Sequence, residues 1–309
     1  MSKFFSEDKK KIVLISIYAT IVVIIGLMAA LLVTQLSKPD AVPENNGGGQ
    51  SNDAAESFKD ETVTAEQMAS GSLVLVNKDH KWLIEDDSTM VNIAEKYPDL
   101  PCSIALPSTY EAESTALAAF NKMIVDAYKN ITDAKIVINT AYRNFADQTA
   151  NSATPAGESE FHTGLSFRLN DVSGKQMGID NDSLEGKYDW LYQNAHKYGF
   201  IVRYPDNKSL ITGQTQLESI FRYVGVAHAT YMKENGLCLE EYLELLRDYT
   251  YDKPLSIKGA DGKSYQVYYA VADESSQIKV STRYACEISG DNIGGYIVTV
   301  NKSVRATTK

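Results

Sequence analysis

The spacing of apolar residues divides the later part of the chain into two regions. Up to residue 252, short apolar runs typical of buried strands alternate with segments of helical period. Beyond residue 252 the period becomes two, and Asp261-Gly262 is a typical hairpin turn. The pattern therefore predicts an α+β domain at 66–252 and a small C-terminal β extension at 253–309. The expected strands are 73–76, 135–138, 164–169, 200–204, 221–224, 264–270 and 295–300, and the expected helices are 111–129, 184–198 and 239–248.

Two of the expected helices carry more detailed signals. The helix at 111–129 has one apolar face, which is formed by Leu117, Phe120, Ile124 and Ala127. Gly199 follows the helix at 184–198, and a glycine at that place commonly ends a helix in a left-handed conformation.

The N-terminal region contains one long apolar segment. Residues 12–36 are 25 consecutive positions without a charged side chain. At ~1.5 Å per residue such a helix reaches about 37 Å, which exceeds the ~30 Å hydrocarbon core of a bilayer. The alternatives are a buried core helix and a signal peptide, but the apolar region of a signal peptide usually has only about 7–15 residues and ends in a small-residue cleavage site. Because residues 35–39 are a poor cleavage site, the sequence predicts an uncleaved transmembrane helix at 12–36.

Charged residues around this helix predict its orientation. Lys9-Lys10-Lys11 precedes the helix, whereas only Lys38 follows it closely. By the positive-inside rule, residues 1–11 form a cytoplasmic tail and the chain beyond the helix is extracellular. Residues 37–65 are rich in Pro, Gly, Asn and acidic residues, which predicts a flexible linker. The expected location is the cell membrane, with a single pass.

Charge and cysteine content exclude several functions. The 309 residues include 30 basic and 40 acidic ones, for a formal net charge of −10. Such a chain does not hold nucleic acid through a general basic field, and anionic lipid should repel its extracellular part. Only the helix is therefore expected to contact the lipid bilayer. Cys102, Cys238 and Cys286 are too few for a disulfide scaffold, although one disulfide remains open.

Five segments between residues 70 and 250 have the order and spacing of known motifs. They are LVLVNKDH at 73–80, AYRNF at 141–145 with Gln148, GESEFHTGL at 157–165, NAHKYGFIVRYP at 194–205, and ITG at 211–213 with FRYVG at 221–225. On these residues the chain resembles the VanY-type D-alanyl-D-alanine carboxypeptidases, peptidase family M15. The block ISGDN at 288–292 with YIVTV at 296–300 is similar to C-terminal extensions of such proteins. The resemblance implies an M15 D,D-carboxypeptidase-like core.

The family's chemistry rests on a zinc site with two motifs. In Ser-x-His-x-x-Gly-x-x-x-Asp the His and Asp bind zinc, and in Glu-x-x-His the Glu is the general base and the His the third ligand. The metal lowers the pKa of a bound water and polarises the scissile carbonyl. Here the first motif begins at Ser159 but has Phe161 and Arg168 at its ligand positions. The second has Leu217 for the Glu and Ile220 for the His. The resemblance therefore implies no zinc cofactor and no catalytic residue in this chain.

A shift of the motifs by one residue does not restore the site. His162 is next to a ligand position, but adjacent side chains of an extended segment point to opposite faces, so we expect it to face away. If His162 took the place of the motif His, the motif Asp would fall seven residues later at Leu169, which binds no metal. Glu218 is likewise one residue from the position of the base, and the residues beside it do not coordinate a metal. The other histidines are expected to be structural or exposed, and they are His80, His196 and His228.

Some substrate-side positions of the family remain. There, the Arg of the Tyr-Arg motif stabilises developing charge, and the Gln and the motif Ser hold the C-terminal end of the peptide. The resemblance gives these roles to Arg143, Gln148 and Ser159. An Arg–carboxylate contact can hold a D-Ala terminus without zinc. The alternative is that all three are ordinary fold contacts, and Arg168 fits either a second anion contact or a partner for a nearby acid.

Three functions follow from these observations. The first is a catalytically inactive, membrane-anchored relative that binds a peptidoglycan stem peptide or a cell-wall protein, and four coordinated replacements favour it. The second is an active peptidoglycan D,D-carboxypeptidase with relocated metal ligands, or a zinc-free hydrolase of another type. The third is a purely structural interaction module, in which Phe161, Leu217 and Ile220 fill the former cleft.

Overall fold

The computed structural model describes residues 57–307, apart from 152–153, 179–185, 216 and 273. The predicted cytoplasmic tail at 1–11, the transmembrane helix at 12–36 and most of the predicted linker lie outside these residues. In the described part, no helix combines the length and the apolar composition that crossing a bilayer requires.

A five-stranded mixed sheet lies at the centre of the first region, with strand order β3-β5-β6-β8-β7. Its pairs are antiparallel except for β3 with β5. Its members are β3 (Ser103–Ile104), β5 (Ile136–Thr140), β6 (Ser166–Asp171), β7 (Phe200–Val202) and β8 (Ile220–Tyr223), and a separate ladder joins β2 (Met90–Asn92) to β4 (Glu111–Glu113). The four strands predicted between residues 135 and 224 are therefore confirmed, with shifted ends.

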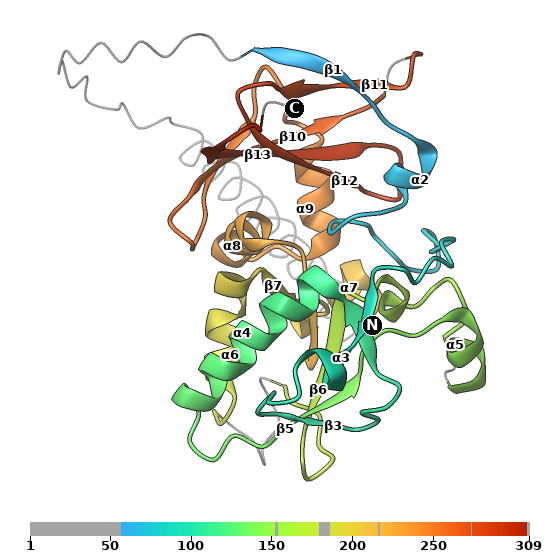
Figure 1. Ribbon diagram of the computed structural model, residues 1–309, viewed down its shortest axis with the longest axis vertical. Helices are drawn as coiled ribbons and strands as arrows, with labels where there is room; N and C mark the ends of the chain where they lie inside the picture. The colour runs from blue at the N-terminus through green and yellow to red at the C-terminus, as the bar shows by residue number, and fades with distance from the viewer. Residues whose placement is uncertain (1–56, 152–153, 179–185, 216, 273, 308–309) are drawn as a thin grey trace, which may run out of the picture. The chain divides into compact units, whose positions relative to one another are not determined.

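Helix α4 (Ser114–Asn130) packs its predicted apolar face on this sheet. Leu117, Phe120, Ile124 and Ala127 are fully buried in a core shared with β5, β6 and α6 (Asp189–Asn194), and α4 and α6 lie side by side (Figure 1). The helix begins later than predicted because 111–113 pairs as β4, and the Glu113 carboxylate then caps the helix by accepting the Ala116 N–H.

The helix predicted at 184–198 is shorter and divided. Its described part is α6 followed by the 3₁₀ helix η2, and residues 184–185 lie outside the description. Gly199 ends it with φ 87°, as predicted. The other short helices are α2 (Ala65–Met68), α3 (Ile93–Lys96), α5 (Phe145–Asn151), α7 (Ser209–Thr212), η1 (Glu160–Thr163), η2 (Ala195–Tyr198) and η3 (Asp206–Lys208).

The prediction of a strand at 73–76 is wrong. The side chains of this segment are buried, but its backbone has no neighbouring strand. Instead, the Leu75 N–H donates to the carbonyl of Asp291, and the Arg222 guanidinium donates to the carbonyl of Val74. The segment is apolar because its side chains are buried. Its backbone N–H and C=O groups form single hydrogen bonds with a loop and with the Arg222 side chain rather than with a neighbouring strand.

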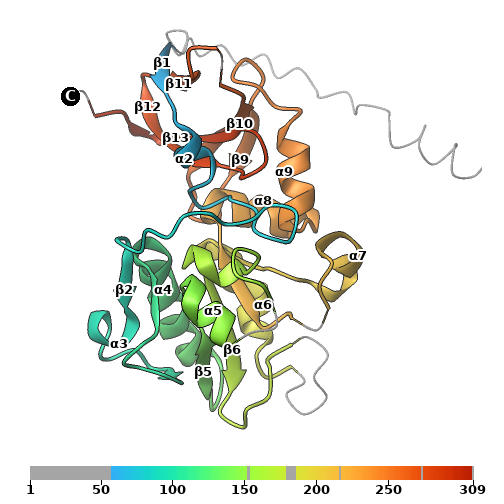
Figure 2. The same cartoon turned by 90° about the vertical axis from the view of Figure 1, so that its right-hand side faces the viewer.

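The predicted C-terminal extension forms a four-stranded antiparallel sheet of order β12-β13-β10-β9. The Asp261-Gly262 turn joins its first two strands as predicted, with φ 77° at the glycine. Helices α8 (Val226–Asn235) and α9 (Leu239–Leu246) lie between this sheet and the central sheet (Figures 1 and 2). The strands are β9 (Leu255–Lys258), β10 (Ser264–Ala270), β12 (Tyr284–Gly290) and β13 (Tyr296–Arg305).

The linker predicted at 37–65 extends too far. Residues 58–62 form β1, which pairs antiparallel with β11 (Gln277–Ser281), and Val63 is buried in the core of the extension. The polar composition hid this strand because most of its side chains are exposed and only its backbone pairs.

Candidate functional site

The replaced zinc and base positions come together in the fold. Phe161 on η1 and Ile220 on β8 pack with Tyr204 in an apolar cluster, and Leu217 packs against it. Phe161 is 6% exposed and Ile220 1%. Side chains of this cluster therefore occupy the place where the family motifs would converge on a metal.

The residues at this place do not fit a zinc ion. Zinc in proteins takes Cys, His, Asp or Glu ligands, and none of the four motif positions holds one. Within residues 57–307, gaps aside, no group of three or more such side chains is arranged to hold a metal ion. The adjacent Glu218 is engaged elsewhere, because its Oε1 accepts the Asp206 N–H at 3.3 Å.

His162 is held by the backbone through both ring nitrogens. The Gly157 N–H donates to Nε2 at 3.0 Å, so the proton resides on Nδ1, which donates to the Arg143 carbonyl at 2.7 Å. Burial lowers the pKa of His162, the charge of Arg143 lowers it further, and the bond to the Arg143 carbonyl acts in the opposite direction. The expectation that His162 faces away assumed an extended segment, which is wrong because residues 160–163 form the 3₁₀ helix η1; in the structure the backbone engages both ring nitrogens of His162.

Two guanidinium groups border the apolar cluster. The Cζ atoms of Arg143 and Arg168 each lie 5.6 Å from the centroid of the Phe161 ring. Nη2 of Arg143 donates to Thr140 Oγ1 at 3.3 Å, whereas Nε of Arg168 is buried and has no hydrogen-bond partner among the described residues. Burial, followed by the charge of Arg143, lowers the pKa of Arg168. In the described part of the chain neither group forms an ion pair, so the site carries positive charge without a counterion.

The three predicted substrate-binding residues have different settings. Arg143 and Ser159 both contact Phe161, and the Ser159 hydroxyl caps η1 by accepting the Phe161 N–H at 3.3 Å. Gln148, on α5, is 1% exposed and donates to the Thr154 carbonyl at 2.9 Å. Its Oε1 is buried without a partner among the described residues. The structure thus brings Arg143 and Ser159 together, while Gln148 is anchored to another segment.

A buried ionic network under the site was missed from the sequence. Glu160 accepts from Arg222 and, at 2.9 Å, from Nε of Arg203, whose other nitrogens bind both carboxylate oxygens of Glu240. Arg222 also donates to the carbonyl of Ser72. Both arginines are fully buried. An arginine within an apolar strand is the feature of the sequence that could have predicted this network, because such a residue is rarely buried without a partner.

The network sets the charge of Glu160. Burial alone raises the pKa of this carboxyl, but the opposing effects of Arg222 and Arg203 are larger together and hold the pKa below its usual range. An ionised Glu160 thus fixes the position of η1, which carries Phe161.

Among the other histidines, His228 joins three elements of the structure. His228 is buried, with Nδ1 2.8 Å from the Tyr242 hydroxyl and Nε2 2.9 Å from the Thr299 hydroxyl, so it joins α8 to α9 and β13. The structural role expected for it is confirmed. All three cysteines are free thiols, so the disulfide left open by the sequence is absent.

Comparisons with known proteins agree with the motifs. The profile of the family described as VanY, D-alanyl-D-alanine carboxypeptidase, matches residues 110–226. A D-alanyl-D-alanine carboxypeptidase of Enterococcus faecium is 35% identical over 267 residues, which are 83% of this chain and 82% of that protein. The putative carboxypeptidase YodJ of Bacillus subtilis (strain 168) is 33% identical over 164 residues, which are 50% of this chain and 56% of that protein.

A solved structure extends the agreement to the fold. The crystal structure of the vancomycin resistance D,D-dipeptidase VanXYg, in complex with a D-Ala-D-Ala phosphinate analogue, has a TM-score of 0.65 and 25% identity to this chain. The match covers 80% of this chain and 100% of that one. With its mixed α/β fold and its motif frame, the chain belongs to the VanY-type D-alanyl-D-alanine carboxypeptidases of peptidase family M15.

Proposed function

We propose that this protein binds the carboxylate end of a peptide, such as the D-Ala terminus of a peptidoglycan stem peptide, and does not hydrolyse it. One observation carries the proposal. Three of the four positions of the zinc ligands and the base lie in an apolar cluster, and the fourth holds Arg168, which borders that cluster together with Arg143; neither guanidinium has a counterion in the described residues.

The absence of hydrolysis follows from the chemistry of the replacements. The family reaction needs a water activated by zinc and a base that takes its proton. Leu217 cannot take a proton, and Phe161 and Ile220 have no atom that coordinates a metal. The charge of Arg168 opposes a dication at the same place.

Carboxylate binding follows from the arginine pair. A carboxylate next to Arg143 and Arg168 would offset the burial and the repulsion by Arg143 that lower the pKa of Arg168, and it would give the buried Nε a hydrogen-bond acceptor. The unpartnered Oε1 of Gln148 is suited to accept a peptide N–H. VanXYg, which is similar to this chain, binds a D-Ala-D-Ala analogue, and this supports the same class of ligand for the chain described here.

The same proposal includes anchoring in the membrane, with the folded domain extracellular. It rests on the uncharged segment 12–36 and on Lys9-Lys10-Lys11 before it. Protease added to intact cells should digest the domain, and digestion only after permeabilisation would contradict this orientation.

Calorimetric titration of the full-length chain tests binding. A peptide ending in D-Ala-D-Ala should bind saturably, and the same peptide with a C-terminal amide should bind at least about tenfold more weakly, because the charge-assisted bonds are lost. Arg143→Ala with Arg168→Ala should abolish binding. The matched control is Arg305→Ala, which removes an exposed arginine that also lies over an aromatic ring, and it should change nothing. Absence of saturable binding to the unmodified chain would remove the proposal.

Zinc content and D-Ala release test the lack of hydrolysis. After incubation with zinc and removal of the excess, the chain should hold almost no metal and release no D-Ala. A combined variant, Phe161→His, Arg168→Asp, Leu217→Glu and Ile220→His, should gain zinc. About one zinc per unmodified chain, together with chelator-sensitive D-Ala release, would instead establish an active carboxypeptidase. A chain that neither binds nor cleaves the peptide would be a structural module.

A further inference from the structure

Strand β5 is irregular beside the two arginines of the proposed peptide site. In its antiparallel pairing with β6 the register shifts between Ile138 and Thr140, so that Thr140 lies opposite Arg168. A regular continuation of the ladder, in which Ile138 lies opposite Leu169, would place Asn139 there instead. The extra residue makes this a β-bulge, a feature that commonly re-aims a side chain next to a functional site.

A tyrosine side chain holds the bulge. The hydroxyl of Tyr110 donates to the carbonyl of Asn139 at 2.5 Å. Burial raises the pKa of Tyr110, so its hydroxyl keeps its proton, while the charge of Arg143 and a hydrogen bond with the Thr140 side chain act in the opposite direction. The extra residue of the strand thus has a carbonyl that is satisfied by a side chain.

The bulge brings the hydroxyl of Thr140 to Arg143. Thr140 is 2% exposed, and its Oγ1 accepts from Nη2 of Arg143 at 3.3 Å. The backbone of Arg143 is fixed separately, because its N–H donates to the Phe161 carbonyl and its carbonyl accepts from His162. Among the described residues, Thr140 is the only hydrogen-bond partner of this guanidinium. The direction of the Arg143 side chain therefore depends on Thr140.

The two guanidinium groups need such a restraint to stay together. The Cζ atoms of Arg143 and Arg168 each lie 5.6 Å from the centroid of the Phe161 ring, and like charges around one ring repel each other. A hydrogen bond that keeps Arg143 beside Arg168 opposes this repulsion before a carboxylate is bound. Binding then requires less ordering of a flexible side chain, which favours affinity.

We propose that Thr140, placed by the bulge at Asn139, is a positioning residue that holds Arg143 beside Arg168 and so sets the preference of the site for a free peptide carboxylate. The inference rests on the proposed binding of a peptide at these two arginines. Thr140 acts through Arg143 and is not itself a contact of the peptide.

Calorimetric titration of the full-length chain with the peptide ending in D-Ala-D-Ala, and with its C-terminal amide, tests this role. Thr140→Val keeps the shape of the side chain but removes the hydroxyl, and it should weaken binding of the carboxylate peptide by several-fold to about tenfold. Binding of the amide should change little, so the preference for the carboxylate should shrink. Thr140→Ser keeps the hydroxyl and should keep both affinities. A merely structural role of Thr140 would weaken both peptides together.

Two further variants support this comparison. Thr230→Val is the matched control, because Thr230 on α8 is also 2% exposed and uses its hydroxyl in hydrogen bonds, and this variant should change neither affinity. Tyr110→Phe removes the bond to the Asn139 carbonyl and leaves Thr140 in place. It should weaken the carboxylate peptide selectively, so the proposal can be tested even where Thr140→Val fails to fold.

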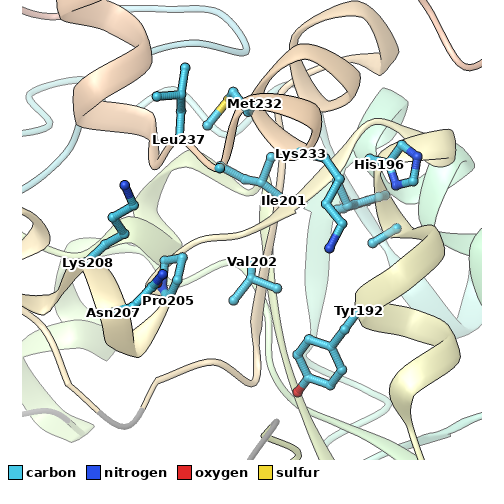
Figure 3. Close-up of a pocket in the computed structure, with 13 residues that line it drawn as sticks. Tyr192, His196, Ile201, Val202, Pro205, Asn207, Lys208, Met232, Lys233 and Leu237 are labelled. Atoms are coloured by element: carbon cyan, nitrogen blue, oxygen red, sulfur yellow. The ribbon is translucent and has the colours of Figure 1, made fainter. Parts of the chain in front are cut away.

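A separate cavity offers the peptide another place to bind. It has a volume of about 190 Å³, lies beside β7 and has Lys233 among its lining residues (Figure 3). Neither Thr140 nor the two arginines line it, so Lys233→Ala should leave peptide binding unchanged. Binding that is lost in Lys233→Ala but kept in Thr140→Val would overturn the proposal.

The titrations separate this inference from the proposed function. If the unmodified chain binds the peptide saturably and Thr140→Val binds it as tightly and as selectively, the positioning role is overturned and the proposed function stands. If the unmodified chain binds no peptide, the proposed function fails, and the positioning role fails with it.

Discussion

At the scale of single residues, the four replacements and the ionic network beside them affect the site in opposite ways. Phe161, Arg168, Leu217 and Ile220 stand where the family motifs have zinc ligands and the base. Glu160, one position from Phe161, keeps the motif segment in place through Arg203 and Arg222. A buried ion pair is costly to break because the remaining charge has no partner. The frame of the site is thus preserved independently of its chemistry.

Glu160→Gln should destabilise the protein by about 3–5 kcal/mol, because Arg222 and Arg203 lose a buried counterion. Urea unfolding followed by circular dichroism measures the change. The matched control is Glu158→Gln, whose partner Lys81 is 52% exposed, and it should cost at most about 1 kcal/mol. Equal effects of the two substitutions would contradict a structural role of the network.

The lowered pKa of Glu160 also predicts a pH dependence. In the unfolded chain this carboxyl titrates near its usual 4.5, so below that pH the unfolded state binds more protons than the folded state. The contribution of Glu160 is therefore fully present above pH 4.5 and is lost as pH falls through the lower folded pKa. The stability difference between the unmodified chain and Glu160→Gln should shrink progressively below pH 4.5. A difference that stays constant there would refute this assignment.

At the scale of elements, the turn from η1 into β6 fixes the site. Gly164 has φ 66°, and a Cβ at this position would meet Met90 Sδ and lie 2.9 Å from the Glu113 backbone nitrogen. Because Met90 of β2 and Glu113 of β4 approach so closely, the glycine is required both by its conformation and by the space around it.

Gly164→Ala should destabilise the protein by about 1–3 kcal/mol more than Gly174→Ala. Gly174 also has a positive φ, of 82°, but has no atom within 4 Å of a built Cβ, so it reports the backbone strain alone. Thermal unfolding of the two variants measures the difference. Similar unfolding midpoints would mean that the neighbours of Gly164 yield without cost.

At the scale of the whole molecule, the predicted domain boundary at residue 252 does not separate independent cores. Leu255 and Ile257 of β9 and Val267 of β10 share one buried core with α8, α9 and Leu73. The extension is thus part of the structure that supports the carboxypeptidase-like region.

A chain that ends at residue 252 should consequently lose cooperative unfolding and aggregate, because the apolar surface of α8 and α9 would be exposed. Thermal unfolding and size-exclusion chromatography of the truncated and full-length proteins measure this. A soluble truncated protein with an unchanged midpoint would contradict the shared core.

Local sequence determined the elements whose signals are local. The apolar face of α4, the left-handed Gly199 and the Asp261-Gly262 hairpin were all predictable, because periodicity and turn chemistry act within a few residues. The resemblance to the family pointed to Arg143 and Ser159, and in the structure each contacts Phe161.

Tertiary structure alone decided what those positions form. The packing of Phe161 against Ile220 depends on contacts between residues far apart in the chain. The same is true of whether Arg168 has an acidic partner. The same reason explains the strand wrongly expected at 73–76, since an apolar run indicates burial but not the partner of its backbone. The pairing of β1 with β11 was invisible in a polar sequence because backbone hydrogen bonds leave no trace in side-chain composition.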